Sequence, residues 1–385
     1  MNGTNTTFFE LHNLSIFQDG DDDFDDIDDD DGLGDMVGVV PRHVYLGFIY
    51  FILGFGSIGN ACIIALMQDK DFHNMSYSVY LQVLAVSDTL LLVTVGVEDI
   101  LDHQYGRLGH FVTSSVAFCK FWNYVANVFR LSSPWLVVSM TADRFAAVVF
   151  PLKRSFLCSR STAIVVSSLV MATAFGEAVY HIVLSKPFPE EGACDPPAWD
   201  SLENYYYFRT LVLETSLPCV LIFFLNVYII TVINRSRKFR AAAAAGSQEK
   251  APRVDKATVS LLAVSIMAFV ALIPISALQV AEWRMDKELA EFERDLINNK
   301  TQDVEGFESL EDRREEAGDI WPALNLVFLF NFGHNFYVML ITGPRFRQKV
   351  ITWFRCFRRM RRQDPSSQAT NSYRDTEESK VEDRF

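Results

Sequence analysis

The sequence predicts an all-α membrane protein: a seven-transmembrane helix bundle followed by a short amphipathic helix on the membrane surface. Half of the 385 residues are apolar, and they gather in long blocks. A helix rises about 1.5 Å per residue, so it needs about 20 apolar residues to cross a hydrocarbon core of about 30 Å. Buried helices of soluble proteins rarely run so far without a charge, which disfavours a soluble fold. Seven blocks meet the requirement: 44–67, 77–97, 111–149, 161–184, 205–233, 257–280 and 320–341.

The distribution of Lys and Arg predicts the orientation in the plasma membrane. Basic residues follow the third, fifth and seventh blocks, and such loops belong in the cytoplasm. An odd number of spans then places the N-terminus outside, where Asn2, Asn5 and Asn13 begin glycosylation sequons. No cleavable signal peptide is evident, so the first span is expected to act as a signal anchor. The net charge of −13 gives no indication of nucleic-acid binding.

The regions outside the bundle differ in composition. Residues 1–43 are expected to form a disordered, acidic, glycosylated tail, because the run of Asp is too repulsive to pack. The bundle covers 44–343, with an amphipathic helix at 344–358 and a disordered cytoplasmic tail at 359–385. Residues 241–245 predict a helical extension of the fifth span. The long acidic loop at about 282–319 is predicted to contain its own short helix, with Leu289, Phe292 and Leu296 on one face.

Two polar residues stand within the first two spans. Asn60 lies in the first, and Leu84-Ala-Val-Ser-Asp88 places a carboxylate in the second. Polar groups at that depth are functional candidates by default, because they are costly unless they face the bundle interior. Together these motifs resemble those of rhodopsin-like (class A) G-protein-coupled receptors. The resemblance implies that Asp88 binds a sodium ion with Ser133, Asn331 and Asn335, and a hydrogen-bond network without an ion is the alternative. Both interpretations stay open.

The third span ends with Asp143-Arg144-Phe145, and Arg144 lies twenty-five residues after Cys119. This is the separation found in the family between its helix-three cysteine and the arginine of its Asp-Arg-Tyr motif. The resemblance implies that Arg144 pairs with Asp143 at rest and contacts a heterotrimeric G protein in the open state, and it implies arrestin as a further partner. The alternative is a membrane-edge anchor.

The six cysteines divide by compartment. Cys119 and Cys194 are both expected on the oxidising extracellular side, where a disulfide is predicted. Cys62 and Cys219 are expected in the core, and Cys158 as a free cytoplasmic thiol. Cys356 follows a basic amphipathic stretch that resembles helix eight of the family, so it is a candidate for palmitoylation.

Several positions depart from the family pattern. Pro218 and Pro274 match family positions and predict kinks within the fifth and sixth spans. Leu272 replaces the usual Trp, Asn226 replaces a Tyr, and Asn335-Phe336 followed by Met339 replaces Asn-Pro-x-x-Tyr. The last replacement resembles invertebrate neuropeptide receptors of the FMRFamide type.

The outer half of the bundle predicts a cationic peptide ligand. Ala126 replaces the Asp of amine receptors, and 323–332 contains no Lys for retinal. Glu98 and Asp99 are hypothesised to receive the basic end of a peptide, of an amidated Arg-Phe type, through Arg to carboxylate pairs. Two alternatives stay open: Arg130 pairs internally with Glu214, or His181 is only an interhelical residue. The ligand-binding candidates are Glu98, Asp99, Arg130, Glu177, His181, Glu214, Gln279 and Trp283, and the outer half of the bundle also contains Asp102 and Glu282.

The predicted function is therefore that of a neuropeptide receptor rather than an enzyme. A constitutively active or orphan receptor-like protein is the first alternative, and a receptor for a non-peptide small molecule is the second. A transporter or intramembrane enzyme is disfavoured, because neither repeat symmetry nor a catalytic cluster is evident, and no cofactor is expected beyond the sodium ion. The acidic tail and loop either attract a cationic peptide or serve as solvated spacers. The end at Phe385 suits a PDZ domain.

Overall fold

The computed structural model describes residues 36–105, 115–188, 193–195, 205, 208–244, 256–297 and 304–362. The first tail with its three sequons, and the C-terminal tail from residue 363 with Phe385, lie outside the described residues. The side chains of Asp102, Cys194, Leu296 and Cys356 lie outside them as well.

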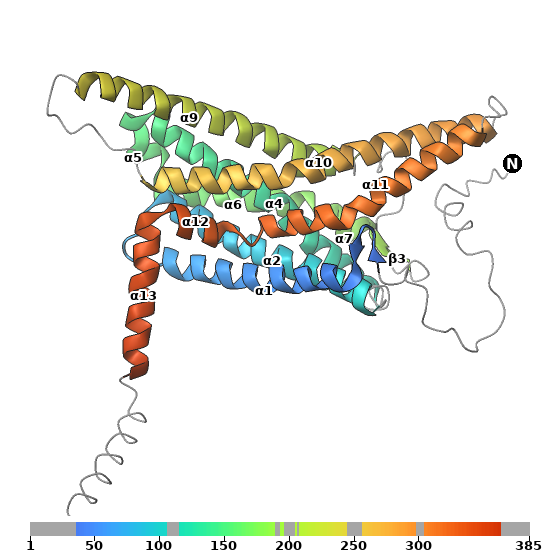
Figure 1. The fold of residues 1–385 in the computed structure, drawn as a ribbon, viewed down its shortest axis with the longest axis horizontal. Helices are drawn as coiled ribbons and strands as arrows, with labels where there is room; N and C mark the ends of the chain where they lie inside the picture. The colour runs from blue at the N-terminus through green and yellow to red at the C-terminus, as the bar shows by residue number, and fades with distance from the viewer. Residues whose placement is uncertain are drawn as a thin grey trace, which may run out of the picture.

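The described part of the chain is mainly helical, and its long helices lie side by side (Figure 1). Five helices are long and apolar enough to cross a membrane, and seven spans result when two bent helix pairs are each taken as one span, which confirms the predicted bundle. The long helices are α1 (Arg42–Met67), α2 (Ser76–Tyr105), α4 (Val116–Val149), α6 (Arg160–Glu177), α9 (Leu217–Ala244), α10 (Lys256–Ile297), α11 (Val304–Asn331) and α13 (Pro344–Arg362). Shorter helices are η1 (Pro151–Lys153), α5 (Arg154–Leu157), α7 (Val179–Leu184), η2 (Phe208–Ser216) and α12 (Asn335–Thr342).

Helix α4 occupies the centre of the bundle and contacts α2, α6, α9 and α10. Its Leu136 and Met140 are fully buried, because they face neighbouring helices instead of the membrane. Many apolar side chains elsewhere are exposed in the isolated chain, among them Phe51 and Phe224. Apolar surface of this kind is the normal outer face of helices that lie in lipid.

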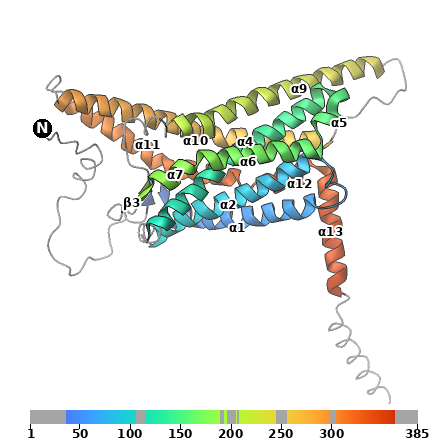
Figure 2. The same cartoon turned by 180° about the vertical axis from the view of Figure 1, so that it is seen from behind.

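The two ends of the bundle carry different structures (Figures 1 and 2). At one end lie two antiparallel hairpins, β1 (Met36–Val37) with β2 (Val40–Pro41), and β3 (Lys186–Phe188) with β4 (Ala193–Asp195). At the opposite end α13 leaves the bundle and runs across its axis. Phe346 anchors α13, because its buried ring contacts Phe336 with centroids 5.5 Å apart. The family-like helix eight of the sequence prediction thus exists as a separate helix, and it runs to Arg362.

The described residues of 282–319 belong to two long helices and form no separate short helix, so that prediction is wrong. Instead α10 continues to Ile297 and α11 begins at Val304, and the two extend together beyond the rest of the bundle (Figure 1). Met285, Leu289 and Leu310 are buried between them. Met285 and Leu289 are four residues apart on one face of α10, so this helix still has an apolar face to bury against α11 and continues past the bundle.

The fifth span begins as a π-helix, η2, which the sequence did not predict. Pro218 was expected to kink the middle of the span, but it is the second residue of α9, directly after the wide turns. Proline lacks the N–H that would continue the π-helical ladder to the carbonyl five residues earlier. The indole of Trp135 donates to that carbonyl, on Leu213, at 2.9 Å. Helix α9 reaches Ala244, so the predicted extension into 241–244 is present.

Prolines within helices occur at the expected Pro274 in α10 and also at Pro134 in α4 and Pro322 in α11. The seventh span is bent by 57° between α11 and α12. Gly333 lies at this break, and a Cβ there would come within 2.8 Å of Gly56 Cα. Glycine is therefore required for the close approach of α1 to the bend.

Candidate functional site

A cavity of about 400 Å³ opens among α1, α2, α4, α10, α11 and η2, toward the end of the bundle that carries the β-hairpins. This volume lies within the range of about 300–1,000 Å³ found for ligand pockets. Five of the predicted ligand-binding residues line it: Glu98, Asp99, Arg130, Glu214 and Gln279. The other lining residues are Tyr45, Val95, Pro134, Thr215, Ile275, Gly318, Trp321, Pro322, Asn325 and Phe328.

The two carboxylates of α2 are held by polar partners from three other helices. Asp99 accepts hydrogen bonds from the Tyr45 hydroxyl at 3.1 Å and from Asn325 Nδ2 at 3.1 Å. The indole of Trp122 donates to Glu98. Tyr45 and Asn325 are buried, so these bonds orient the Asp99 carboxylate beside the cavity. None of these three partners was predicted, although polar residues within apolar spans give a weak indication of such a role.

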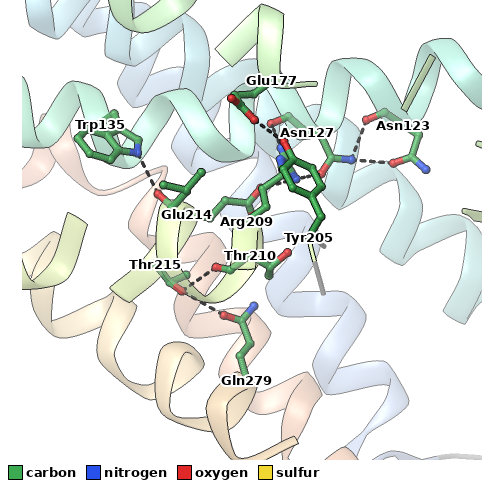
Figure 3. Close-up of polar contacts among 11 residues, drawn as sticks. Asn123, Asn127, Trp135, Glu177, Tyr205, Arg209, Thr210, Glu214, Thr215 and Gln279 are labelled. Atoms are coloured by element: carbon green, nitrogen blue, oxygen red, sulfur yellow. Dashed lines mark hydrogen bonds and ion pairs between the residues drawn. The ribbon is translucent and has the colours of Figure 1, made fainter. Parts of the chain in front are cut away.

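Glu214 does not pair with Arg130, and that interpretation is wrong. Its partner is Arg209, whose Nη1 lies 2.7 Å from Glu214 Oε1. The guanidinium also donates to Asn127, at 2.9 Å to the side-chain oxygen and 3.1 Å to the backbone carbonyl (Figure 3). Arg209 is 0% exposed and lies over the ring of Tyr180. A charge so deeply buried requires these partners, so the group is a structural tie between η2 and α4.

Arg130 reaches the cavity without such a partner. Its side chain is half-buried, and it forms no ion pair with a described residue. Its Nε is buried and makes no hydrogen bond to the described part of the chain. Pro134, one turn later, lacks the N–H that would normally bond to the Arg130 carbonyl. The cavity therefore has two carboxylates from α2 and a guanidinium from α4 on its wall.

The remaining ligand candidates lie at different places. Gln279 accepts a hydrogen bond from Thr215 at 3.3 Å and joins α10 to η2 (Figure 3).

Glu177 accepts a hydrogen bond from Tyr205 beside a second, open pocket on the outside of α6 and α7. His181 is buried next to Tyr180, with neither ring nitrogen bonded to a described residue. Trp283 lies on the extension of α10, where the Nζ of Lys287 is 4.6 Å from the centroid of its ring. The structure does not bring these last three to the first cavity.

Asp88 is 1% exposed in the middle of the bundle. It accepts hydrogen bonds from Ser133 and from Asn335 Nδ2, the latter at 2.8 Å. Asn60 is not bonded to Asp88 but donates to the Phe332 carbonyl at 3.0 Å, where the seventh span breaks. The Asn331 side-chain oxygen is buried without a partner among the described residues. The Asp88 carboxylate and the Ser133 hydroxyl, which lie in contact, are oxygen donors of the kind that a hard cation such as sodium prefers, and the Asn331 oxygen is of the same kind.

At the other end of α4, Arg144 is 3% exposed. Its Nε donates to Asp143 at 3.0 Å, and its Nη2 donates to the Ser76 hydroxyl at 3.0 Å. Ser76 in turn donates to Asp143 at 2.9 Å, and Tyr77 lies below the guanidinium at 5.2 Å. The Asp143–Arg144 pair implied by the resemblance is thus present, with Ser76 and Tyr77 of α2 as unpredicted members. Phe145 contacts the ring of Tyr228 on α9 with centroids 5.2 Å apart.

The positions that depart from the family pattern are integrated into the core. Leu272 is buried, and Asn226 accepts a hydrogen bond from Ser265 of α10 at 2.9 Å. Asn226 therefore links α9 to α10 directly. Met339 is buried in a cluster with Leu261.

Cys119 is disulfide-bonded, whereas Cys62, Cys158 and Cys219 are free. The register of the β3–β4 hairpin pairs Cys194 with Pro187, and α4 contacts both strands. The pairing of Cys119 with Cys194 stays a prediction, because the Cys194 side chain lies outside the described residues.

The helix bundle, the buried carboxylate of α2 and the arginine at the end of α4 define a multi-pass helical membrane protein of the receptor class. The model of the rhodopsin family of seven-transmembrane receptors matches residues 59–298, more than half of the chain. The chain belongs to this family, whose members are signalling receptors and not enzymes.

The chain is also similar to thyrotropin-releasing hormone receptors. It is 28% identical over 128 residues to those of Bos taurus and Homo sapiens, covering 33% of this chain and 31% of each relative. It is 29% identical over 115 residues to that of Mus musculus, covering 30% and 28%. The chain therefore matches about a third of the length of these curated relatives. The narrower resemblance to FMRFamide-type receptors stays a prediction.

Proposed function

We propose that this chain is a plasma-membrane receptor that binds an extracellular peptide in the first cavity and activates a heterotrimeric G protein. The observation that carries the proposal is the cavity itself, which presents Glu98 and Asp99 within a bundle of the rhodopsin family. The relatives are named as receptors for thyrotropin-releasing hormone, which supports an extracellular hormone-like ligand. The N-terminus lies outside and α13 in the cytoplasm.

The two carboxylates suit the cationic end of a peptide. Asp99 is already oriented by Tyr45 and Asn325, so little ordering is needed when a guanidinium or ammonium arrives. Arg–carboxylate pairs are bidentate and directional, which favours a basic side chain over a diffuse positive charge.

Signal transfer requires a change at the opposite end of the bundle. Arg144 is held by Asp143 and Ser76 and is almost fully buried. Ligand binding favours a state in which this arginine is released toward the G protein, and the ligand shifts the equilibrium only by its differential affinity for that state. Asp88 and its partners lie between the two ends, and Asp88 with Ser133 and Asn331 would hold a sodium ion there.

The test is a G-protein activation assay in cells that express the chain, challenged with a library of neuropeptides, each as the amide and as the free acid, beside an unstimulated control. A saturable response to one basic peptide family is expected. Glu98→Gln and Asp99→Asn should each reduce potency about ten- to hundredfold, the loss expected for a hydrogen bond to a charged group.

The matched control is Glu288→Gln, which removes the same charge from an exposed position on the extension of α10. It separates contact in the cavity from long-range attraction by acidic residues. Equal losses in Glu288→Gln and Asp99→Asn would argue against the cavity as the binding site. High basal signalling that no peptide changes would favour the constitutive alternative.

A further inference from the structure

The cavity wall carries charged groups of both signs. Three carboxylates and one guanidinium line the cavity, and one of the carboxylates, Glu214, is already paired with Arg209. Glu98 and Asp99 form an acidic side of the cavity on α2, and Arg130 is a separate basic group on α4. A ligand that is only cationic would pair with the carboxylates of α2 and would leave Arg130 facing a like charge.

Arg130 is placed as a recognition group and not as a structural one. The two structural arginines of this bundle each have a carboxylate partner: Arg209 contacts Glu214 and Asn127, and Arg144 contacts Asp143 and Ser76, although Nε of Arg209 and one Nη of Arg144 are also buried without a hydrogen bond to a described residue. Arg130 has no such contact with a described residue, and its Nε is buried without a hydrogen bond. A guanidinium at membrane depth is costly without a partner, and the described residues supply no carboxylate to Arg130, so a ligand in the cavity is placed to supply one.

We propose that Arg130 binds a carboxylate of the ligand, so that the receptor selects a dipolar peptide with a basic group at Glu98 and Asp99 and a free carboxylate at Arg130. The planar guanidinium presents parallel N–H donors that match a carboxylate in a bidentate pair, whereas an amide carbonyl offers one uncharged acceptor. This inference rests on the proposed peptide receptor function. It replaces the amidated peptide end of the sequence hypothesis by a free acid.

The test compares two probes that differ in one group: N-acetyl-arginyl-phenylalanine with a free carboxylate, and the same dipeptide as the carboxamide. Their binding to the full chain in nanodiscs of neutral lipid is measured by the shift in its thermal unfolding, without a G protein. We expect the free acid to bind about ten- to hundredfold more tightly than the amide, as for a charged hydrogen bond. In Arg130→Gln the two probes should bind equally.

Arg130→Lys provides the second variant, because it keeps the charge and loses the bidentate geometry. It should retain part of the preference for the acid. Folding is checked in the unliganded state, where Arg130→Gln should unfold at no lower temperature than the wild type, since it removes no contact with a described residue.

Three results would overturn the inference: equal or tighter binding of the amide to the wild type, an acid preference that persists in Arg130→Gln, or no binding of either probe. The proposed function fails separately. If the chain binds the free acid selectively but activates no G protein, the role of Arg130 stands and the proposed activation of a G protein fails.

Discussion

Arg209 Nη1 lies 2.7 Å from Glu214 Oε1, and both residues belong to the π-helix η2. The wide turns of a π-helix bring residues five apart onto one face. Arg209 therefore reaches both Glu214 within its own helix and Asn127 on α4. This local geometry leaves Arg130 without the carboxylate that the sequence appeared to offer it.

The first prediction concerns this buried pair. Arg209→Met should lower the free energy of unfolding by about 3–5 kcal/mol, because it leaves Glu214 buried without its counter-charge. The double variant Arg209→Met with Glu214→Leu should recover most of that loss, since no charge then remains unpaired. Thermal unfolding of the purified chain measures both. A double variant no more stable than Arg209→Met would contradict the role assigned to the pair.

The second prediction concerns the resting arrangement of Arg144. Ser76 bonds to both Asp143 and Arg144, so Ser76→Ala removes two hydrogen bonds to charged groups. If these bonds hold the resting state, basal G-protein activation should rise about tenfold, which corresponds to about 1.4 kcal/mol.

Ser78→Ala is the matched control, because Ser78 lies on the same helix and bonds at 2.9 Å to the Met67 carbonyl instead. Its basal activity should stay at the wild-type level. Arg144→Ala should abolish activation at normal surface expression. Unchanged basal signalling in Ser76→Ala would show that the hydrogen bonds of Ser76 with Asp143 and Arg144 do not restrain activation.

The seven spans could be predicted from sequence because each depends only on a local run of apolar residues. The contact of Arg144 with Asp143 could be predicted because Asp143-Arg144-Phe145 resembles a short motif of the family. The carboxylates of the cavity were found because charges in apolar spans are rare.

Pairings between distant segments could not be predicted in the same way. Asp99 meets Tyr45 and Asn325 only because three helices converge, and neither partner has a distinctive local pattern. The π-helix was missed because its sequence resembles an ordinary apolar helix, and its extra width changes which residues share a face. The partner of Glu214 was misassigned for that reason.

The third prediction concerns the close approach at the bend of the seventh span. Gly333→Ala should destabilise the chain by about 1–3 kcal/mol, the usual cost of overpacking. The new methyl group would lie 2.8 Å from Gly56 Cα, which is backbone and cannot rotate away. Gly54→Ala in α1 is the control, because a Cβ there meets nothing within 4 Å among the described residues. Equal unfolding temperatures for the two variants would refute the close contact.

The fourth prediction concerns the attachment of α13. Lys349 Nζ lies 2.8 Å from Asp69 and 2.7 Å from Asp71, so it ties α13 to the loop after α1. The bond to Lys349 lowers the pKa of Asp69, and the bonds to Asp69 and Asp71 raise the pKa of Lys349. The stabilisation that charged Asp69 gives to the attachment of α13 is therefore present above the ordinary carboxyl pKa, and it is lost as pH falls through the lowered pKa of Asp69. The stabilisation that charged Lys349 gives to the same attachment is complete below the ordinary ammonium pKa, and it is lost as pH rises through the raised pKa of Lys349.

Within about pH 5 to 10 both groups are charged, so the tie should not change with pH in that window. Spin labels on the loop and on α13 should report a single narrow distance there in the purified chain, and a broadened one at either extreme. Lys349→Gln should show the broadened distance already at neutral pH. Arg355→Gln, which removes the same charge from an exposed position of α13, should keep the narrow distance. A narrow distance in Lys349→Gln would mean that burial of Phe346 alone fixes the helix, and the charged tie would then have no role in its orientation.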